Sequence, residues 1–260
     1  MKIHFFGTCS GTQPVAGTHH LSFAIETGGG YYWFDAGETC SYTAHLMGVD
    51  LLKIRKIFIS HPHMDHVGGL GNLLWTIRKL TQGKNGRQKD GDIHIHIPDM
   101  TTLDGFMQVL KNTEGNFEID FQIFGHEVVD GLVADDGILR VTAQHNGHLP
   151  HEDGAPWRSF SYLIEAEGKR IVFSGDIKAV SDLAPLMENG CDALIMETGH
   201  HKVADACAEL AATNWPIKRL WFAHNGPDIL KDVPAAAERA AQSAFAGEKH
   251  ICWDGETLEL

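Results

Sequence analysis

The sequence predicts a layered α/β fold, in which strands form sheets and helices cover the outer faces. Short apolar runs bounded by turn residues recur along the chain, and helical patterns alternate with them mostly in the first half and the last third. The chain has 260 residues, of which 43% are hydrophobic and 21% are charged. A chain of this length and composition can bury a sizeable core.

In the first half, the apolar runs predict strands at residues 3–6, 21–26, 31–35, 56–60 and 93–97, and helical periodicity predicts helices at 41–49, 70–80 and 101–111. Gly28-Gly29-Gly30 joins the second and third of these strands, which predicts a hairpin. The polar stretch Thr81 to Asp92 predicts a loop, and its composition suits a segment that shapes access to a site.

In the second half, the same patterns predict strands at residues 117–124, 138–143, 159–166, 170–174, 193–196, 218–222 and 250–253, with helices at 203–213 and 233–245. His94 and His96 alternate with isoleucines, so both side chains project to one face of their strand. No other ligand residue flanks them, and we expect that face to be solvated or at an edge.

Three histidines and an aspartate stand within one short run directly after the strand 56–60, in His61-Pro62-His63-Met64-Asp65-His66. Imidazole nitrogens and carboxylate oxygens together suit zinc and neighbouring transition metals. Gly68-Gly69-Leu70-Gly71 follows at once, and such residues let the backbone crowd a site. The alternative is a solvated, histidine-rich turn. The run offers more ligands than one ion accepts from a single loop, so it predicts two metals.

Three further candidate ligands each follow a predicted strand: His148, Asp176 and His224. Strand-to-loop junctions are where α/β folds commonly gather functional side chains. Taken alone, each of the three could equally be a turn former or a capped polar group.

Taken together, Asp35-Ala36-Gly37, the His61 run, His148, Ser174-Gly175-Asp176 and His224 resemble the metallo-β-lactamase superfamily of metallohydrolases over essentially the whole chain. Trp253-Asp254-Gly255 with Leu258 resembles the last strand and turn of that superfamily. The resemblance implies a four-layer αββα sandwich, a single domain over residues 1–260, and metals at the edge between two sheets.

The resemblance also implies the roles of the ligands. His61, His63 and His148 would hold the first of two divalent ions, Asp65, His66 and His224 the second, and Asp176 would bridge them. Zinc is the expected metal, with manganese and iron as alternatives. Asp35 would hydrogen-bond a ligand histidine. His145 and His151 compete with His148 for its place.

Glu197 and His200, in Met196-Glu197-Thr198-Gly199-His200, are predicted catalytic residues together with Asp65. A carboxylate can orient and charge a nearby imidazole, which then protonates a leaving group; the alternative for His200 is a solvated loop histidine. The Glu-x-x-His placement and the opening Gly7-Thr8-Cys9-Ser10-Gly11-Thr12 resemble the ribonuclease Z branch and its phosphodiesterase relatives.

These residues predict a binuclear metal-dependent hydrolase that cleaves a small phosphodiester by attack of metal-bound hydroxide, because zinc lowers the pKa of bound water from about 16 to roughly 7. The alternatives are hydrolysis of a carboxylic ester, thioester or lactone on the same metals, and a metal-stabilised binding module without turnover.

The formal net charge of −13 disfavours transfer RNA and other large nucleic acids as partners, and so does the lack of a basic, Gly/Pro-rich arm. A small anionic substrate is expected instead. The five cysteines are widely spread and read as reduced thiols, and no apolar stretch reaches membrane-spanning length, so we expect a cytoplasmic protein without membrane contact. The oligomeric state stays open, and a homodimer is among the assemblies that the sequence allows.

Overall fold

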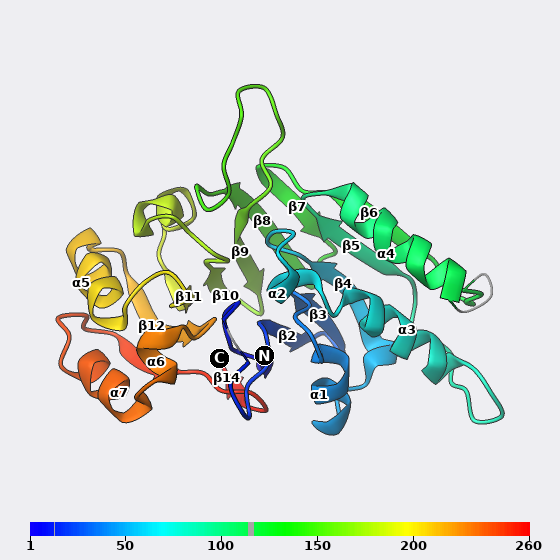
Figure 1. Ribbon diagram of the computed structural model, residues 1–260. Helices are drawn as coiled ribbons and strands as arrows, with labels where there is room; N and C mark the ends of the chain where they lie inside the picture. Colours follow the sequence, from blue (N-terminus) through cyan, green and yellow to red (C-terminus); the bar gives the residue numbers. More distant parts are fainter. Residues whose placement is uncertain (13, 114–116) are drawn as a thin grey trace.

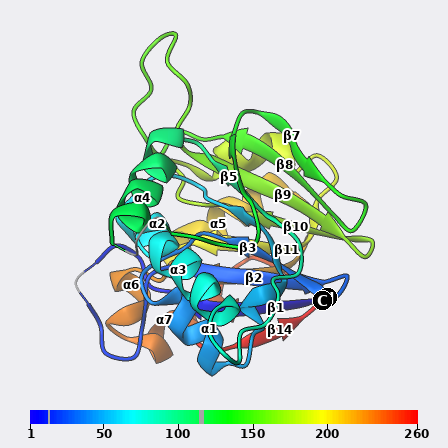
Figure 2. The same ribbon diagram turned by 90° about the vertical axis from the view of Figure 1, so that its right-hand side faces the viewer.

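Two seven-stranded sheets face each other, and helices cover the outer face of each (Figures 1 and 2). This arrangement is seen in a computed structural model, which describes residues 1–12, 14–113 and 117–260. The four layers confirm the predicted αββα fold class. Among the described residues, no helix is long and apolar enough to cross a membrane.

The first sheet contains the N-terminal strands and the last strand of the chain, in the order β14-β1-β2-β3-β4-β5-β6. Its strands are β1 (Lys2–Gly7), β2 (Ser22–Thr27), β3 (Gly30–Phe34), β4 (Ile54–Phe58), β5 (Ile93–Ile97), β6 (Ile123–Glu127) and β14 (Thr257–Glu259). Strands β3 to β6 are parallel to one another. The helices on this side are α1 (Cys40–Leu46), η1 (Leu51–Lys53), α2 (Met64–Val67), α3 (Leu70–Thr81) and α4 (Met100–Thr113).

The second sheet has the order β13-β12-β11-β10-β9-β8-β7. Its strands are β7 (Gly131–Asp135), β8 (Leu139–His145), β9 (Phe160–Ala166), β10 (Lys169–Phe173), β11 (Cys191–Glu197), β12 (Ile217–Ala223) and β13 (Glu248–Ile251). Strands β10 to β13 are parallel. This side carries η2 (Val180–Leu186), α5 (Val203–Thr213), α6 (Pro227–Leu230) and α7 (Val233–Ala241).

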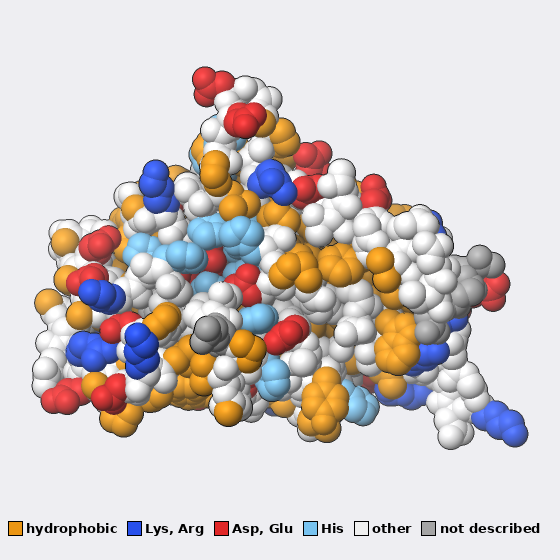
Figure 3. Space-filling view, viewed as in Figure 1, with side chains coloured by type: hydrophobic (Ala, Val, Ile, Leu, Met, Phe, Trp, Pro, Cys, Tyr) orange, Lys and Arg blue, Asp and Glu red, His pale blue; other side chains and the backbone are white. Residues whose placement is uncertain are grey.

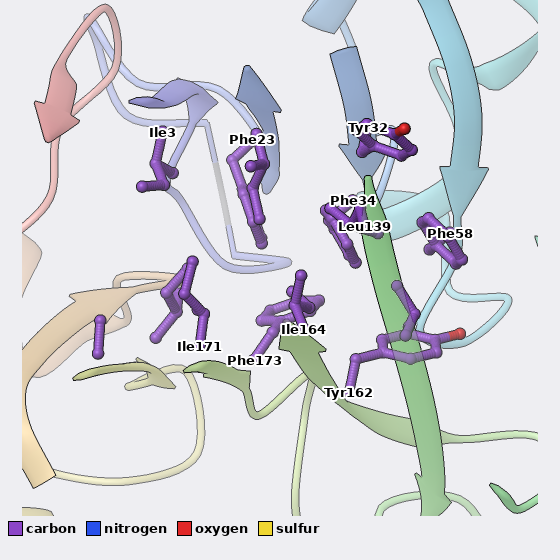
Figure 4. Packing of buried hydrophobic residues seen from close by; sticks show 14 of the residues in the cluster. Ile3, Phe23, Tyr32, Phe34, Phe58, Leu139, Tyr162, Ile164, Ile171 and Phe173 are labelled. Atoms are coloured by element: carbon purple, nitrogen blue, oxygen red, sulfur yellow. The ribbon is translucent and has the colours of Figure 1, made fainter. Parts of the chain in front are cut away.

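Aromatic side chains fill the space between the two sheets (Figure 4). The ring of Phe34 stacks on Phe23 at 5.2 Å and on Phe58 at 4.9 Å, and the ring of Phe173 meets Phe23 from the opposite sheet at 5.0 Å. Trp33, the neighbour of Phe34, points the other way into the core beneath the helices, because successive side chains of a strand face opposite sides. Both faces of the central strands are therefore buried, as their apolar runs predicted. All five cysteines are buried and free.

The predicted strand at 117–124 is wrong for most of its length, since β6 begins at Ile123. Phe117 lies under the guanidinium of Arg78, and Phe121 packs in the core beneath the helices. The apolar residues of this segment thus serve packing without joining the sheet. Strand β7, at the edge of the second sheet, was missed because it is short, only Ala134 of its five residues is buried, and it carries no apolar alternation.

The loop after α3 does not border the edge where His61 lies, contrary to expectation. Lys89 is buried and donates from Nζ to the carbonyl oxygen of Ile54 at 2.6 Å, and Asp90 N donates to Leu52 O. Both contacts are at the beginning of β4, whereas His61 follows its end. The loop therefore packs at the opposite end of the strand.

The expected solvated face of β5 is also wrong for one of its two histidines. His96 is 5% exposed and stacks between the ring of Phe58, at 4.7 Å, and that of His126, at 4.8 Å. His94 is the more exposed member, and its Nδ1 lies 2.9 Å from His126 Nε2. The histidines of β5 thus extend the aromatic packing between the sheets.

Candidate metal centre

The ends of several strands deliver polar side chains to one edge of the two sheets. His61 follows β4, His148 follows β8, Asp176 follows β10, Glu197 ends β11 and His224 follows β12. Parallel strands end at the same edge of a sheet, which is where α/β folds gather ligands. In Figure 3 the pale blue histidines surround a hollow that contains acidic side chains.

The first group of candidate ligands is His61, His63, His148 and Asp176, whose ligand atoms all lie within 4.8 Å of one another. Asp176 Oδ2 lies 3.8 Å from His61 Nε2 and 3.7 Å from His148 Nε2. His63 Nδ1 lies 3.4 Å from His148 Nε2.

The second group is Asp65, His66 and His224, again within 4.8 Å. Both Asp65 Oδ2 and His66 Nε2 lie 3.1 Å from His224 Nε2. The other oxygen of Asp176, Oδ1, lies 3.3 Å from His66 Nε2. Asp176 therefore stands between the two groups and turns one oxygen toward each.

The chemistry of this set fits metal ions. His61 Nε2, Asp176 Oδ1 and His224 Nδ1 are buried and have no hydrogen-bond partner among the described residues. A buried polar atom left unpaired costs about 1–3 kcal/mol, and a bound cation would remove that cost. Imidazole nitrogen with carboxylate oxygen is a donor set that zinc, manganese and iron accept.

Asp35 fixes the orientation of the candidate ligand His66. Its Oδ2 accepts a hydrogen bond from His66 Nδ1 at 2.6 Å, and its Oδ1 accepts one from Ser60 N at 2.6 Å. The first bond places a proton of His66 on Nδ1, so Nε2 is the nitrogen that can face a metal. Asp35 and His224 both have positive φ angles, 51° and 54°, a conformation that costs non-glycine residues energy and clusters at functional sites.

Burial and neighbouring charges set the protonation of the centre. Burial lowers the pKa of His61 well below its ordinary value. Burial acts the same way on His66, but the carboxylates of Asp176 and Asp35 outweigh it and raise the pKa of His66 well above its ordinary value. The surrounding histidines hold the pKa of Asp176 well below its ordinary value despite burial. The carboxylate of Asp176 thus stays ionised.

Glu197 and His200 lie together at the rim of the centre. Glu197 Oε1 is 3.1 Å from His200 Nδ1, and Glu197 Oε2 accepts a hydrogen bond from His200 N at 2.9 Å. The hydrogen bond to Glu197 raises the pKa of His200. The hydrogen bonds from His200 and His224 overcome burial and lower the pKa of Glu197 to about 2. His200 Nδ1 also lies 3.7 Å from Asp176 Oδ2, so the pair adjoins the candidate ligands.

The structure turns His145 and His151 away from the centre. His145 Nδ1 lies 2.6 Å from Asp130 Oδ2, and its ring stacks on Trp157 at 4.0 Å. His151 stacks on Trp157 at 3.7 Å. His148, His145 and His151 were the alternatives for one metal-ligand position. Of the three, only His148 lies close to Asp176.

The cavity over the centre has a volume of about 280 Å³, and it is lined by Ser10, Gly11, Thr12, His63, Asp65, Asp176, Gly199, His200 and His224. A Cβ on Gly11 would lie 2.7 Å from Asp65 Oδ2, so glycine lets the first loop approach the ligand. Asp254 anchors that loop by accepting hydrogen bonds from Thr8 N and His19 N. Sequence reasoning missed Ser60 and the role of Asp254, because neither residue type in isolation indicates a site.

Proteins named ribonuclease Z are similar to this chain in sequence. The identity is 31% over 148 residues with that of Methanothermobacter thermautotrophicus, covering 57% of this chain and 45% of that protein. It is 26% over 185 residues with that of Listeria monocytogenes, covering 70% and 54%. The chain spans about half the length of these relatives.

Solved structures share the fold at lower identity. The human tRNase Z short form superimposes with a TM-score of 0.72 at 21% identity, covering 100% of this chain and 99% of that one. The Zn²⁺-bound PqqB of Methylobacterium extorquens does so with a TM-score of 0.66 at 16% identity, covering 100% of each chain. These comparisons confirm the metallo-β-lactamase superfamily and its ribonuclease Z and phosphodiesterase-like branch.

The expectation that transfer RNA and other large nucleic acids are unlikely partners is wrong. It rested on the net charge of −13, but the similar proteins carry the names ribonuclease Z and tRNase Z. Net charge sums ionised groups over the whole surface, whereas a substrate responds to the potential at one cavity.

A family model described as "Anti-Pycsar protein Apyc1" matches residues 1–246. Because that match covers nearly all of the sequence, including every candidate ligand, the chain belongs to the Anti-Pycsar protein Apyc1 family.

Proposed function

We propose that this protein is a binuclear metal-dependent hydrolase that cleaves phosphodiester bonds. The observation that carries the proposal is the position of Asp176, which turns one oxygen toward each of two ligand groups while His200 stands beside it. The two groups would be His61, His63 and His148 for one ion, and Asp65, His66 and His224 for the other.

Two divalent ions, zinc first and manganese or iron as alternatives, would act as Lewis acids when bound and lower the pKa of water to about 7. The protein orients the side chains that would bind the ions. His66 is held by Asp35 with Nε2 facing the centre, and Asp65 faces the cavity as both a ligand and part of its wall. No serine or cysteine nucleophile is needed for this chemistry.

His200 is the proposed general acid. Its side chain is 47% exposed and lines the cavity, whereas its partner Glu197 is buried. The Glu197 carboxylate raises the pKa of His200 and so favours the protonated imidazole, the form that can give a proton to the oxygen of the leaving group. Such an acid is most useful when the leaving group is a sugar alkoxide, which departs poorly without a proton.

The names of the relatives favour a phosphodiester over a carboxylic ester or thioester. Ribonuclease Z and tRNase Z are named for cleavage of RNA, and another structure of the same fold is titled a diphosphatase of the PhnP family. The test below includes transfer RNA precursors beside short diesters, because the length of the natural substrate is one of its outcomes.

The experiment compares wild type with His63→Ala on bis(4-nitrophenyl) phosphate, a dinucleotide and a transfer RNA precursor, each with added zinc or manganese. His45→Ala, at an exposed position of α1, is the matched control. We expect His63→Ala to lower kcat/KM by about 100-fold or more and His45→Ala to leave it unchanged. Equal rates for His63→Ala and wild type, or no hydrolysis of any of the three substrates by wild type, would refute the proposal.

A further inference from the structure

Three side chains of different chemistry meet near the end of the chain: His250, Cys252 and Glu256. Their ligand atoms, one from each residue, all lie within 4.8 Å of one another, and none of the three residues belongs to the metal centre. We infer that they form a separate zinc site. This inference goes beyond the proposed function, because the proposed reaction uses none of these side chains.

The site lies on the segment that carries the chain from the second sheet to the first. β13 and β14 are edge strands of these two sheets, and residues 252–256 join them (red in Figure 1). Alternate residues of a strand face the same side, so His250 and Cys252 both face the space between the sheets. The turn at Gly255, which has a φ of 83°, then brings Glu256 back toward them.

His250 and Glu256 are already in contact. His250 Nε2 lies 2.7 Å from Glu256 Oε1, and the other oxygen of Glu256, Oε2, accepts a hydrogen bond from Trp253 N. The hydrogen bond from Trp253 fixes the carboxylate with Oε1 turned toward the imidazole. The alternative is an ordinary surface ion pair, which needs no metal and contributes little to stability.

Cys252 distinguishes this group from an ordinary ion pair. Its side chain is fully buried, and its thiol has no hydrogen-bond partner among the residues that the structure describes. Burial raises the pKa of Cys252 well above its ordinary value, and the Glu256 carboxylate adds to this effect. The thiol therefore keeps its proton when no metal is bound, whereas a divalent cation would displace the proton and bind the thiolate.

The three types of donor atom favour zinc. Imidazole nitrogen, thiolate sulfur and carboxylate oxygen are the side-chain ligands of zinc, which usually has four ligands in a tetrahedral arrangement. Magnesium and calcium prefer oxygen ligands. Three protein ligands leave the fourth position to water. The side chains of His250 and Glu256 are 37% and 26% exposed, so water can reach the site from their side.

An ion at this site would stabilise a wall of the metal centre. Asp254 lies between two of the ligands in sequence, and its carboxylate anchors the first loop over the centre. Asn225, which follows the candidate ligand His224, donates from Nδ2 to the carbonyl oxygen of Cys252 at 2.9 Å. None of the three zinc ligands lines the cavity over the centre, so the role of the site is structural.

Cobalt(II) distinguishes this site from the metal centre. A thiolate bound to cobalt gives an intense charge-transfer band in the near ultraviolet, and the candidate ligands of the centre include no cysteine. Titration of Co²⁺ into the metal-free protein should therefore produce the band in wild type and no band in Cys252→Ala. Cys40→Ala is the matched control, because Cys40 is similarly buried and belongs to no group of candidate ligands among the described residues. It should keep the band.

His250→Ala tests the site at a partly exposed position, where the substitution leaves the core intact. Mutation of a residue that only supports a metal ligand lowers affinity by about 10-fold or more, so removal of a ligand should weaken cobalt binding at least as much. His45→Ala, at an exposed position of α1, should bind cobalt as wild type does. Wild type purified with zinc should also hold one more ion per chain than Cys252→Ala.

The inference is overturned when wild type gives no thiolate band, when Cys252→Ala keeps the band, or when His250→Ala binds cobalt as tightly as wild type. None of these measurements requires hydrolysis. A protein that shows the band and cleaves no diester would contradict the proposed function alone. A protein that cleaves diesters and shows no band would contradict this zinc site alone.

Discussion

At the residue scale, the link between Asp35 and His66 shows how the protein prepares a ligand before any metal arrives. Both side chains are fully buried, and the bond between them is 2.6 Å long. A carboxylate increases the basicity of an imidazole to which it is hydrogen-bonded, and it holds the ring in one tautomer. A ligand that is already oriented loses less entropy on binding.

Asp35→Asn should therefore weaken metal binding while the fold persists. An amide has no charge and can replace only one of the two accepting oxygens, and we expect the affinity for the second ion to fall by about 10–100-fold. Competition with a chromogenic chelator measures that affinity. Asp104→Asn, at an exposed position of α4, is the control. Equal affinities for the two variants would show that Asp35 has no such role.

The Glu197–His200 pair makes a different prediction, because a general acid matters only where the leaving group needs a proton. His200→Ala should lower kcat about 100-fold or more for a dinucleotide and only slightly for bis(4-nitrophenyl) phosphate, whose nitrophenolate departs unaided. His45→Ala, at an exposed position of α1, serves as the control. A loss that is the same for both substrates contradicts the assignment.

At the scale of elements, strands buried on both faces could be predicted and the edge strand β7 could not. β4, β10, β11 and β12 each contain a short apolar run, and the polar residue after each run marked the candidate site. β7 is short and only one of its five residues is buried, so its apolar residues gave too weak a pattern to predict a strand. The roles of Ser60 and Asp254 were missed because they depend on contacts with Asp35, Thr8 and His19, and spacing along the chain does not encode such contacts.

The pair β5–β6 carries a prediction about pH. Burial, aided by His126 and Lys56, lowers the pKa of His96 to about 3. An unfolded imidazole takes up a proton near pH 6.5, whereas His96 in the folded protein stays neutral down to about pH 3. The unfolded state therefore binds more protons in this window. The contribution of neutral His96 to the free energy of unfolding is fully present above pH 6.5 and is lost as the pH falls below that value. The free energy of unfolding changes by at most about 1.4 kcal/mol per pH unit from this group.

His96→Leu keeps an apolar contact with Phe58 and removes the titrating group. We expect the free energy of unfolding, measured by urea denaturation, to depend less steeply on pH between 7 and 5 in this variant than in wild type. His45→Leu, on the exposed side of α1, should leave the slope unchanged. A slope in His96→Leu equal to that of wild type would show that another group controls the acid sensitivity.

At the scale of the whole molecule, the candidate ligands join the two sheets. His61, His63, Asp65 and His66 follow β4 of the first sheet, whereas His148, Asp176 and His224 follow β8, β10 and β12 of the second. Ions held by both sets would therefore link the halves of the sandwich at one edge. The net charge could not predict this link, because it does not say where on the surface the charged groups lie. The expectation about partners was wrong for the same reason.

Removal of metal should consequently lower the stability of the entire protein rather than loosen one loop. Without a cation, the ionised Asp176 faces a centre in which His61 Nε2 and His224 Nδ1 lack partners. A ligand present at 100 times its Kd stabilises the folded state by about 2.7 kcal/mol, which for a chain of this size corresponds to a rise in Tm of roughly 5–10 °C. Calorimetry before and after chelation, followed by zinc addition, measures this shift. His63→Ala should show a smaller change in Tm on chelation than His45→Ala, because it removes one candidate ligand. A wild-type Tm that does not respond to chelation would mean that metal does not hold the two sheets together.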